Sequence, residues 1–179
     1  LIGGKLARKV DEVAELEEAA PDRFQRDKSR VTALGDVAAM LKLPETQKLY
    51  EPETVTLNQI KTGDGSPWQP RRDAEVLLLG DSFTNIYSVQ QIGWGQHAGL
   101  AEQFSYALDR PIDRIAVNAG EEYSAREELV KDLRTHYTIF DRTGRAPHRE
   151  RLADKKVVVY QFACRELLHG NWKLLEIPD

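Results

Sequence analysis

Three short apolar runs in the second half of the chain constrain its fold more than any other feature. They occupy residues 76–79, 115–117 and 157–160, and each is apolar at nearly every position. Such runs are too short for helices and are typical of strands that are buried on both faces. Between them, residues 100–108 and 124–133 carry apolar side chains at helical spacing. This alternation predicts a parallel sheet covered by helices, which is a three-layer α/β/α arrangement of flavodoxin-like type.

The first part of the chain has a different character. Apolar residues recur at helical spacing in two sets, which are Leu6, Val10, Val13 and Ala14, and then Val31, Leu34, Val37, Ala38 and Leu41. Residues 51–74 are rich in proline and glycine and predict an irregular connection with one short extended piece at 55–60. We therefore expect a single domain over residues 1–179, with a helical segment at 1–50, this connection at 51–74, and the α/β core at 75–179.

The composition narrows the possible partners. A net charge of −4 gives no electrostatic reason to expect binding to nucleic acid. No apolar run approaches the roughly 20 residues that a membrane-spanning helix needs. The sequence begins at Leu1 rather than at a methionine. We expect it to be a processed or partial chain, so that residues of the site can lie outside it.

Polar and small residues follow each predicted strand. The first strand leads into Gly80-Asp81-Ser82. In one interpretation Asp81 or Ser82 only caps the helix that follows. In the other, Ser82 is a nucleophile at the carboxyl end of a parallel strand, where ligands of α/β sheets bind. The position directly after the first buried strand favours the second interpretation.

The second predicted strand leads into Asn118-Ala119-Gly120. A serine nucleophile needs backbone donors about 3 Å from the oxyanion that forms during acyl transfer. Glycine allows a substrate to approach the main chain closely. The position of Gly120 therefore predicts an oxyanion hole made by the amides of Ser82 and Gly120. A simple strand-to-helix turn explains this glycine equally well.

These blocks resemble those of a known superfamily. Residues 76–83, which end in Gly-Asp-Ser-Phe, and residues 116–120 are similar to the first two sequence blocks of the SGNH (GDSL) hydrolases. Phe83 and residues 160–167 resemble a narrower group, the SGNH-like domains of the AlgX/AlgJ alginate O-acetylation proteins. The resemblance covers roughly residues 75–168.

The resemblance implies a function as well as a fold. It implies acyl transfer through an acyl-Ser82 intermediate, with no metal or organic cofactor, and O-acetylation of an alginate-like exopolysaccharide in the periplasm or at the cell envelope. The partners would be the polysaccharide and an acyl donor, which can be another protein. A carbohydrate esterase of the SGNH class is one alternative, and an inactive scaffold that binds polysaccharide or a partner is another.

The sequence departs from ordinary SGNH hydrolases in two blocks. Their Gly-x-Asn-Asp block is absent after the third strand, where Arg165 and Glu166 stand instead. Arg165 can bind substrate or simply pair with Glu166. No Asp-x-x-His follows the serine, and in the AlgX/AlgJ group an Asp-x-His pair lies upstream of it. We therefore expect the general base to lie outside this chain, with His169 and His148 as candidates within it.

Further substrate contacts are expected from the loops near the strand ends. Arg165, Tyr123 and Trp94 form the predicted substrate-binding set, with Arg165 able to grip the carboxylate of a uronate. Packing within the fold is an equally good explanation for Trp94. For Tyr123, packing with a hydroxyl that faces solvent is the commoner role.

Overall fold

The computed structural model describes residues 2–16, 24–121, 123–143, 151–170 and 172–176, with backbone only for 134–143 and 169. Contacts divide the chain into two compact units. Unit 1 comprises residues 1–9, 18–69 and 84–110, and unit 2 comprises 10–17, 70–83 and 111–179. The first helix, α1 (Ile2–Val13), has residues in both units. Each unit is described below by itself.

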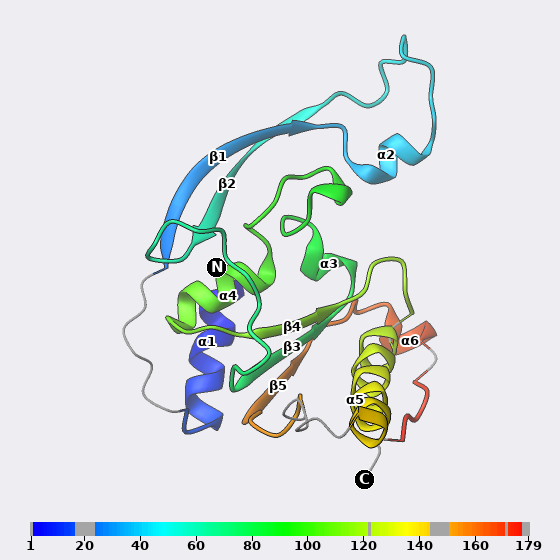
Figure 1. The fold of residues 1–179 in the computed structure, drawn as a ribbon. Coiled ribbons are helices and arrows are strands. Elements are labelled where there is room, and N and C mark those ends of the chain that lie inside the picture. The colour runs from blue at the N-terminus through cyan, green and yellow to red at the C-terminus, as the bar shows by residue number, and fades with distance from the viewer. Residues whose placement is uncertain (1, 17–23, 122, 144–150, 171, 177–179) are drawn as a thin grey trace. The chain divides into compact units, whose positions relative to one another are not determined.

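Unit 1 is built on a long antiparallel ribbon. Strand β1 (Gln25–Ala33) pairs with β2 (Glu53–Lys61) along its full length, and the short helix α2 (Asp36–Met40) lies in their connection (Figure 1). The unit continues with the 3-10 helix η1 (Gln90–Ile92) and with α4 (Leu100–Leu108), which contacts β2. The largest fully buried side chains of this unit are Ile60, Trp68 and Phe104.

The helix expected at residues 31–41 is wrong over its first part, because residues 25–33 form β1. Within β1, Ser29, Val31 and Ala33 are half-buried while the residues between them are exposed, which is the two-residue period of a strand. Thr32 faces Thr54 across the ribbon, and their hydroxyls lie 2.7 Å apart. The helical spacing of Val31 and Leu34 was therefore coincidental, since pairing with β2 determines the local structure. The extended piece expected at 55–60 is confirmed as part of β2.

Unit 2 contains the predicted parallel sheet. Its strands are β3 (Val76–Gly80), β4 (Asp113–Ala116) and β5 (Val157–Tyr160), in the order β4-β3-β5. All five residues of the central strand β3 are buried. The registers pair Gly80 with Ala116 and Leu79 with Tyr160, so the carboxyl ends of the three strands meet at one edge.

Helix α5 (Ser124–Thr143) contacts β3 and β4. Its residues Ala125, Leu129 and Leu133 form a buried cluster with residues of β3 and β4, which are Leu77, Leu79 and Ile115. The short helix α6 (Glu166–His169) follows β5. The α/β class and the three parallel strands are confirmed, whereas the full three-layer arrangement stays a prediction. No helix in the described part of the chain is long and apolar enough to cross a membrane.

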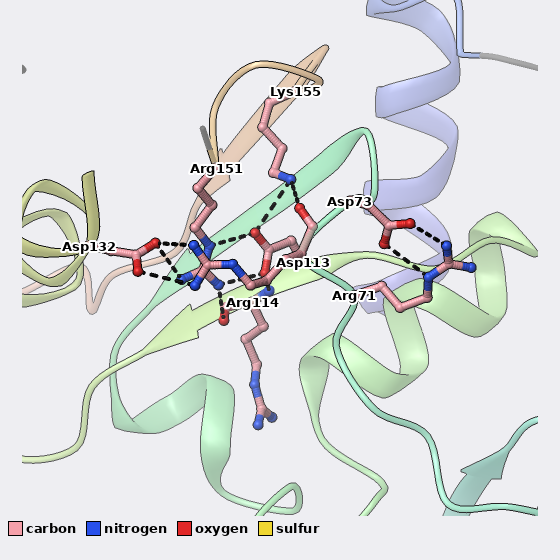
Figure 2. Close-up of polar contacts among 8 residues, drawn as sticks. Arg71, Asp73, Asp113, Arg114, Asp132, Arg151 and Lys155 are labelled. Carbon is pink, nitrogen blue, oxygen red and sulfur yellow. Dashed lines mark hydrogen bonds and ion pairs between the residues drawn. The ribbon is translucent and has the colours of Figure 1, made fainter. Parts of the chain in front are cut away.

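Charged side chains are paired with one another at the amino ends of these strands. The guanidinium of Arg151 donates through Nε and Nη2 to both carboxylate oxygens of Asp113, at 2.7 and 2.6 Å. Figure 2 shows Arg151 between Asp113 and Asp132, and Asp132 also accepts two hydrogen bonds from Arg72. Lys155 Nζ lies 3.5 Å from Asp113, and burial lowers the pKa of this lysine. The side chain of Asp113 is 1% exposed, so this network places a charge in the core together with its counterions.

Candidate active site at the carboxyl end of the sheet

The turn after β3 carries the predicted nucleophile. Asp81 Oδ1 accepts a hydrogen bond of 2.8 Å from the backbone N–H of Phe83, so Asp81 caps the four-residue helix α3 (Ser82–Asn85). Ser82 is the first residue of that helix and is half-buried. The sequence allowed two explanations of Asp81-Ser82, which are a cap of the following helix and a catalytic role for Ser82. The capping is performed by Asp81, and this leaves the Ser82 hydroxyl without that role.

Both neighbouring strands hold this turn in place. The Val117 amide donates to the Gly80 carbonyl at 3.1 Å, and the Gln161 amide donates to the Leu79 carbonyl at 2.8 Å. The side chain of Gln161 also accepts a hydrogen bond from the Asp81 amide, at 3.2 Å. Sequence reasoning gave Gln161 no role. The available signal was its place directly after the predicted strand at 157–160, at the edge where Ser82 was expected.

Gly120 is explained by its own turn. A Cβ atom at this position would lie 2.5 Å from Ser124 Oγ, 2.6 Å from Ser124 Cβ and 3.1 Å from Val117 Cγ1. Any side chain here would therefore collide with the start of α5. This contact accounts for the glycine without a ligand, so the oxyanion hole made by the Ser82 and Gly120 amides stays a prediction.

The predicted substrate-binding residues have partners of their own. Arg165 precedes α6, and its Nε donates to Glu166 Oε1 at 2.9 Å while its side chain remains 67% exposed. The ring of Tyr123 lies below Lys173, whose Nζ is 5.2 Å from the ring centroid. Trp94 belongs to unit 1, where its indole lies against Gly35. The ion pair that was the alternative explanation of Arg165 is present, and it leaves part of the guanidinium accessible.

The general base is not assigned by the described side chains. His148 lies outside the described residues, and of His169 only the backbone is described, as part of α6. His97 belongs to unit 1, where its carbonyl accepts a hydrogen bond of 2.7 Å from the Ile60 amide. In the described part of the chain, no group of three or more His, Cys, Asp or Glu residues is placed to hold a metal ion.

A second arginine at this edge was missed by sequence reasoning. Arg126 lies in the first turn of α5, with its Cζ 5.7 Å from the ring centroid of Tyr160 and 5.9 Å from that of Trp172. Phe162 completes the cluster, since its ring centroid lies 5.3 Å from Tyr160 and 5.0 Å from Trp172. The aromatic residues at positions 160 and 162 were visible in the sequence, but nothing there indicated that an arginine of another element joins them.

Comparisons with known proteins agree with this fold. No protein-family model matches the sequence, and no curated protein has significant similarity to it. Among solved structures, the chain is similar to the O-acetyltransferase domain of Pseudomonas putida AlgJ, with a TM-score of 0.62 and 16% identity. That match covers 97% of this chain and 52% of the AlgJ chain, so this chain spans about half of that protein.

A second similar structure is AlgX from Pseudomonas aeruginosa, with a TM-score of 0.49 and 17% identity over 89% of this chain and 31% of the AlgX chain. The comparison of folds rests on AlgJ. The chain has the fold of the AlgJ O-acetyltransferase domain, and the resemblance to AlgJ that the sequence predicted is confirmed at the level of the fold.

Proposed function

We propose that this chain carries the nucleophile of a serine-dependent O-acyltransferase that acetylates a hydroxyl group of an exopolysaccharide. The observation that carries the proposal is the place of Ser82, which begins a helix directly after the central buried strand of a fold shared with an O-acetyltransferase domain. A turn held by both neighbouring strands can fix a nucleophile in position, which is the main requirement for efficient attack.

The proposed reaction has two steps. In the first, Ser82 Oγ attacks the carbonyl carbon of the acyl donor and transfers its proton to a general base, and the donor's leaving group departs with that proton. In the second, the sugar hydroxyl attacks the carbonyl carbon of the acyl-Ser82 ester and gives its proton to the base. The base passes that proton to Ser82 Oγ as the bond between this oxygen and the acyl group breaks. The amides of Ser82 and Gly120 are proposed to stabilise the oxyanion of both tetrahedral intermediates.

Arg165 and Tyr123 of unit 2 remain proposed contacts of the acceptor sugar, and for Trp94 of unit 1 this role stays an expectation from the sequence. By holding the acceptor sugar, these side chains would favour transfer of the acyl group to the sugar over its hydrolysis by water. Water is present at about 55 M, and transfer competes only if the acceptor hydroxyl is held in place, since positioning can reach effective molarities of about 10⁵ M or more. We expect Arg165→Ala to reduce transfer more than hydrolysis. The periplasm or the cell envelope, where an exopolysaccharide is exported, is the proposed location.

The experiment measures turnover of p-nitrophenyl acetate by the full-length natural protein, with and without an acceptor oligosaccharide, together with mass spectrometry of the sugar and of the Ser82 peptide. Ser82→Ala should lower acetyl turnover by about a thousandfold or more, because the covalent intermediate cannot form. Ser66→Ala, an exposed serine in a turn of unit 1, is the matched control and should have no effect.

Three outcomes separate the alternatives. Acetylated sugar together with an acetyl-Ser82 peptide supports the transferase. Acetate that accumulates with no acetylated sugar would identify an esterase. A protein that binds the oligosaccharide without any turnover would be a binding scaffold. Turnover that is unchanged by Ser82→Ala would instead contradict Ser82 as the nucleophile.

A further inference from the structure

Arg126 presents an unoccupied binding geometry at the carboxyl end of the sheet. Its Nε and Nη2 atoms, here called the Arg126 fork, are buried and have no hydrogen-bond partner among the described residues. These two nitrogens lie on the same side of the guanidinium and donate in parallel, which matches the two oxygens of a carboxylate.

Two other arginines of this chain bind a carboxylate through their Nε and Nη2 atoms. Arg151 uses Nε and Nη2 to hold the two oxygens of Asp113, at 2.7 and 2.6 Å. Arg71 uses the same two atoms to hold Asp73, at 3.1 and 2.5 Å. Both of these forks lie near the amino ends of the strands. The Arg126 fork has the same donors, and no carboxylate of the described residues is bonded to them.

Two charged side chains near the fork in the described part of the chain bind other groups. Glu127 follows Arg126 in α5, but its carboxylate accepts a hydrogen bond of 2.9 Å from Lys173, and this bond lowers the pKa of Glu127. Arg165 lies at the same edge, but its Nε is already bonded to Glu166. Of the two arginines at this edge, Arg126 is therefore the one with both parallel donors available.

The cluster around Arg126 also provides a route for a ligand. Trp172 is the most exposed of the three aromatic rings, at 41%, whereas Tyr160 and Phe162 are half-buried. The Trp172 indole is held by one hydrogen bond, of 2.9 Å, to the Glu166 carbonyl. A carboxylate that reaches the fork would displace this indole. The Tyr160 ring would remain against the guanidinium, and the rings of the cluster would be available to the apolar face of a sugar.

The fork lies close to the proposed nucleophile along the backbone. Tyr160 pairs with Leu79 in the sheet, and the next residue, Gln161, binds the Asp81 amide beside Ser82. A ligand held between Arg126 and the Tyr160–Phe162 segment would therefore adjoin the turn that carries Ser82.

From this geometry we infer that Arg126 is a specificity-determining residue, which binds the carboxylate of an acidic sugar unit in the acceptor by a bidentate hydrogen bond. The inference rests on the proposed function for the identity of the acceptor. It assigns the selection of acidic over neutral sugars to Arg126 rather than to the more exposed Arg165.

The test measures binding rather than catalysis. The probes are a trisaccharide of hexuronic acid, the corresponding neutral hexose trisaccharide, and sodium acetate against sodium chloride at equal ionic strength. Tryptophan fluorescence of the full-length natural protein reports binding, and Trp172→Phe identifies the part of the signal that comes from residue 172. We expect the acidic trisaccharide to change the Trp172 signal and the neutral one to bind at least tenfold more weakly.

Arg126→Lys keeps the positive charge near the rings but loses the parallel donors. It should weaken binding of the acidic trisaccharide by about tenfold to a hundredfold, which is the range for hydrogen bonds to a charged group. Arg126→Gln should abolish the preference for the acidic sugar. Arg71→Lys, which alters the same donor pair at the amino ends of the strands, is the matched control and should bind as wild type does. Circular dichroism melting curves verify that each variant is folded.

Equal affinity for the acidic and neutral trisaccharides, or wild-type affinity in both Arg126 variants, would overturn the inference. Acetate that binds as tightly as the acidic trisaccharide would assign the fork to free carboxylates and overturn the sugar as its ligand. Ser82→Ala protein should bind the trisaccharide as wild type does. A failure of this inference is thereby distinguishable from a failure of the proposed acyl transfer.

Discussion

The two ends of the parallel sheet in unit 2 use charged side chains in opposite ways. At the amino ends of the strands, Asp113 is 1% exposed and holds Arg151 and Lys155, so its buried charge is accompanied by its partners (Figure 2). At the carboxyl ends, the Nε and Nη2 atoms of Arg126 are buried with no acceptor among the described residues. A closed network is the arrangement expected of a part that stabilises the fold, whereas unsatisfied donors are the arrangement expected where a ligand binds.

The first prediction tests the buried charge network around Asp113, at the amino ends of the strands. Asp113→Asn leaves Arg151 and Lys155 as buried cations beside a neutral amide, and should lower the free energy of unfolding by about 3–5 kcal/mol. Urea denaturation followed by circular dichroism measures this change. The matched control is Asp73→Asn, because the Arg71–Asp73 pair is 60% exposed on both side chains and should contribute about 0–1 kcal/mol. Similar losses in the two variants would show that the buried network is no more important than a surface ion pair.

The second prediction concerns the turn after β4 at the other end. Gly120→Ala brings a Cβ atom within 2.6 Å of the Ser124 Cβ, and one of the two residues must shift. Overpacking of this kind should lower the free energy of unfolding by about 1–3 kcal/mol. Adding Ser124→Gly should recover most of that loss, because it removes both of the nearest atoms. A double variant no more stable than Gly120→Ala would show that Gly120 is required for a reason other than this contact.

The sheet was predictable because its signal is local. Short runs of consecutive apolar residues at 76–79, 115–117 and 157–160 predicted three parallel strands from the sequence alone. Only β3 is buried at every position, and Val158 of β5 is 50% exposed. The ribbon of unit 1 was not predictable in the same way, since residues 25–30 are polar and β1 exists because β2 pairs with it. Pairing between distant segments leaves only a weak pattern in either one.

The same distinction between local and long-range signals applies to the residues of the candidate site. Ser82 and Gly120 could be proposed as site residues because each lies in the short segment that follows a predicted strand. Gln161 and Arg126 were missed because their contacts join different elements, as when the Gln161 side chain binds the Asp81 amide. Spacing along one sequence contains no information on which side chain of α5 meets the rings after β5.

The third prediction tests whether Gln161 positions the turn that carries Ser82. Gln161→Leu removes the acceptor of the Asp81 amide and should lower the free energy of unfolding by about 1 kcal/mol. It should lower acetyl turnover about tenfold with little change in KM, because the turn loses its alignment while the sugar contacts remain. Gln161→Glu keeps an acceptor oxygen and should restore most of the rate. If neither variant alters turnover, the hydrogen bond has no part in placing Ser82.

The last and smallest prediction asks whether Glu127 could itself fill the Arg126 fork. The hydrogen bond from Lys173 holds the pKa of Glu127 below its ordinary value of 4.5. A carboxylate with a lowered pKa stabilises the folded state above its unfolded pKa, and this contribution is lost as the pH falls through the folded pKa. Lys173→Ala should therefore raise the pKa of Glu127 towards 4.5 and remove that contribution. Carboxyl ¹³C shifts followed by NMR against pH measure the change, and Lys131→Ala, a weaker influence on the same group, should shift the pKa less. If the pKa stays low in a variant that lacks both Lys173 and Lys131, another cation has taken the carboxylate, and Arg126 is the nearest in sequence. In that case Glu127 is the partner of Arg126 within the chain. The contrast between paired charges at the amino ends of the strands and an unpaired Arg126 at their carboxyl ends then no longer holds.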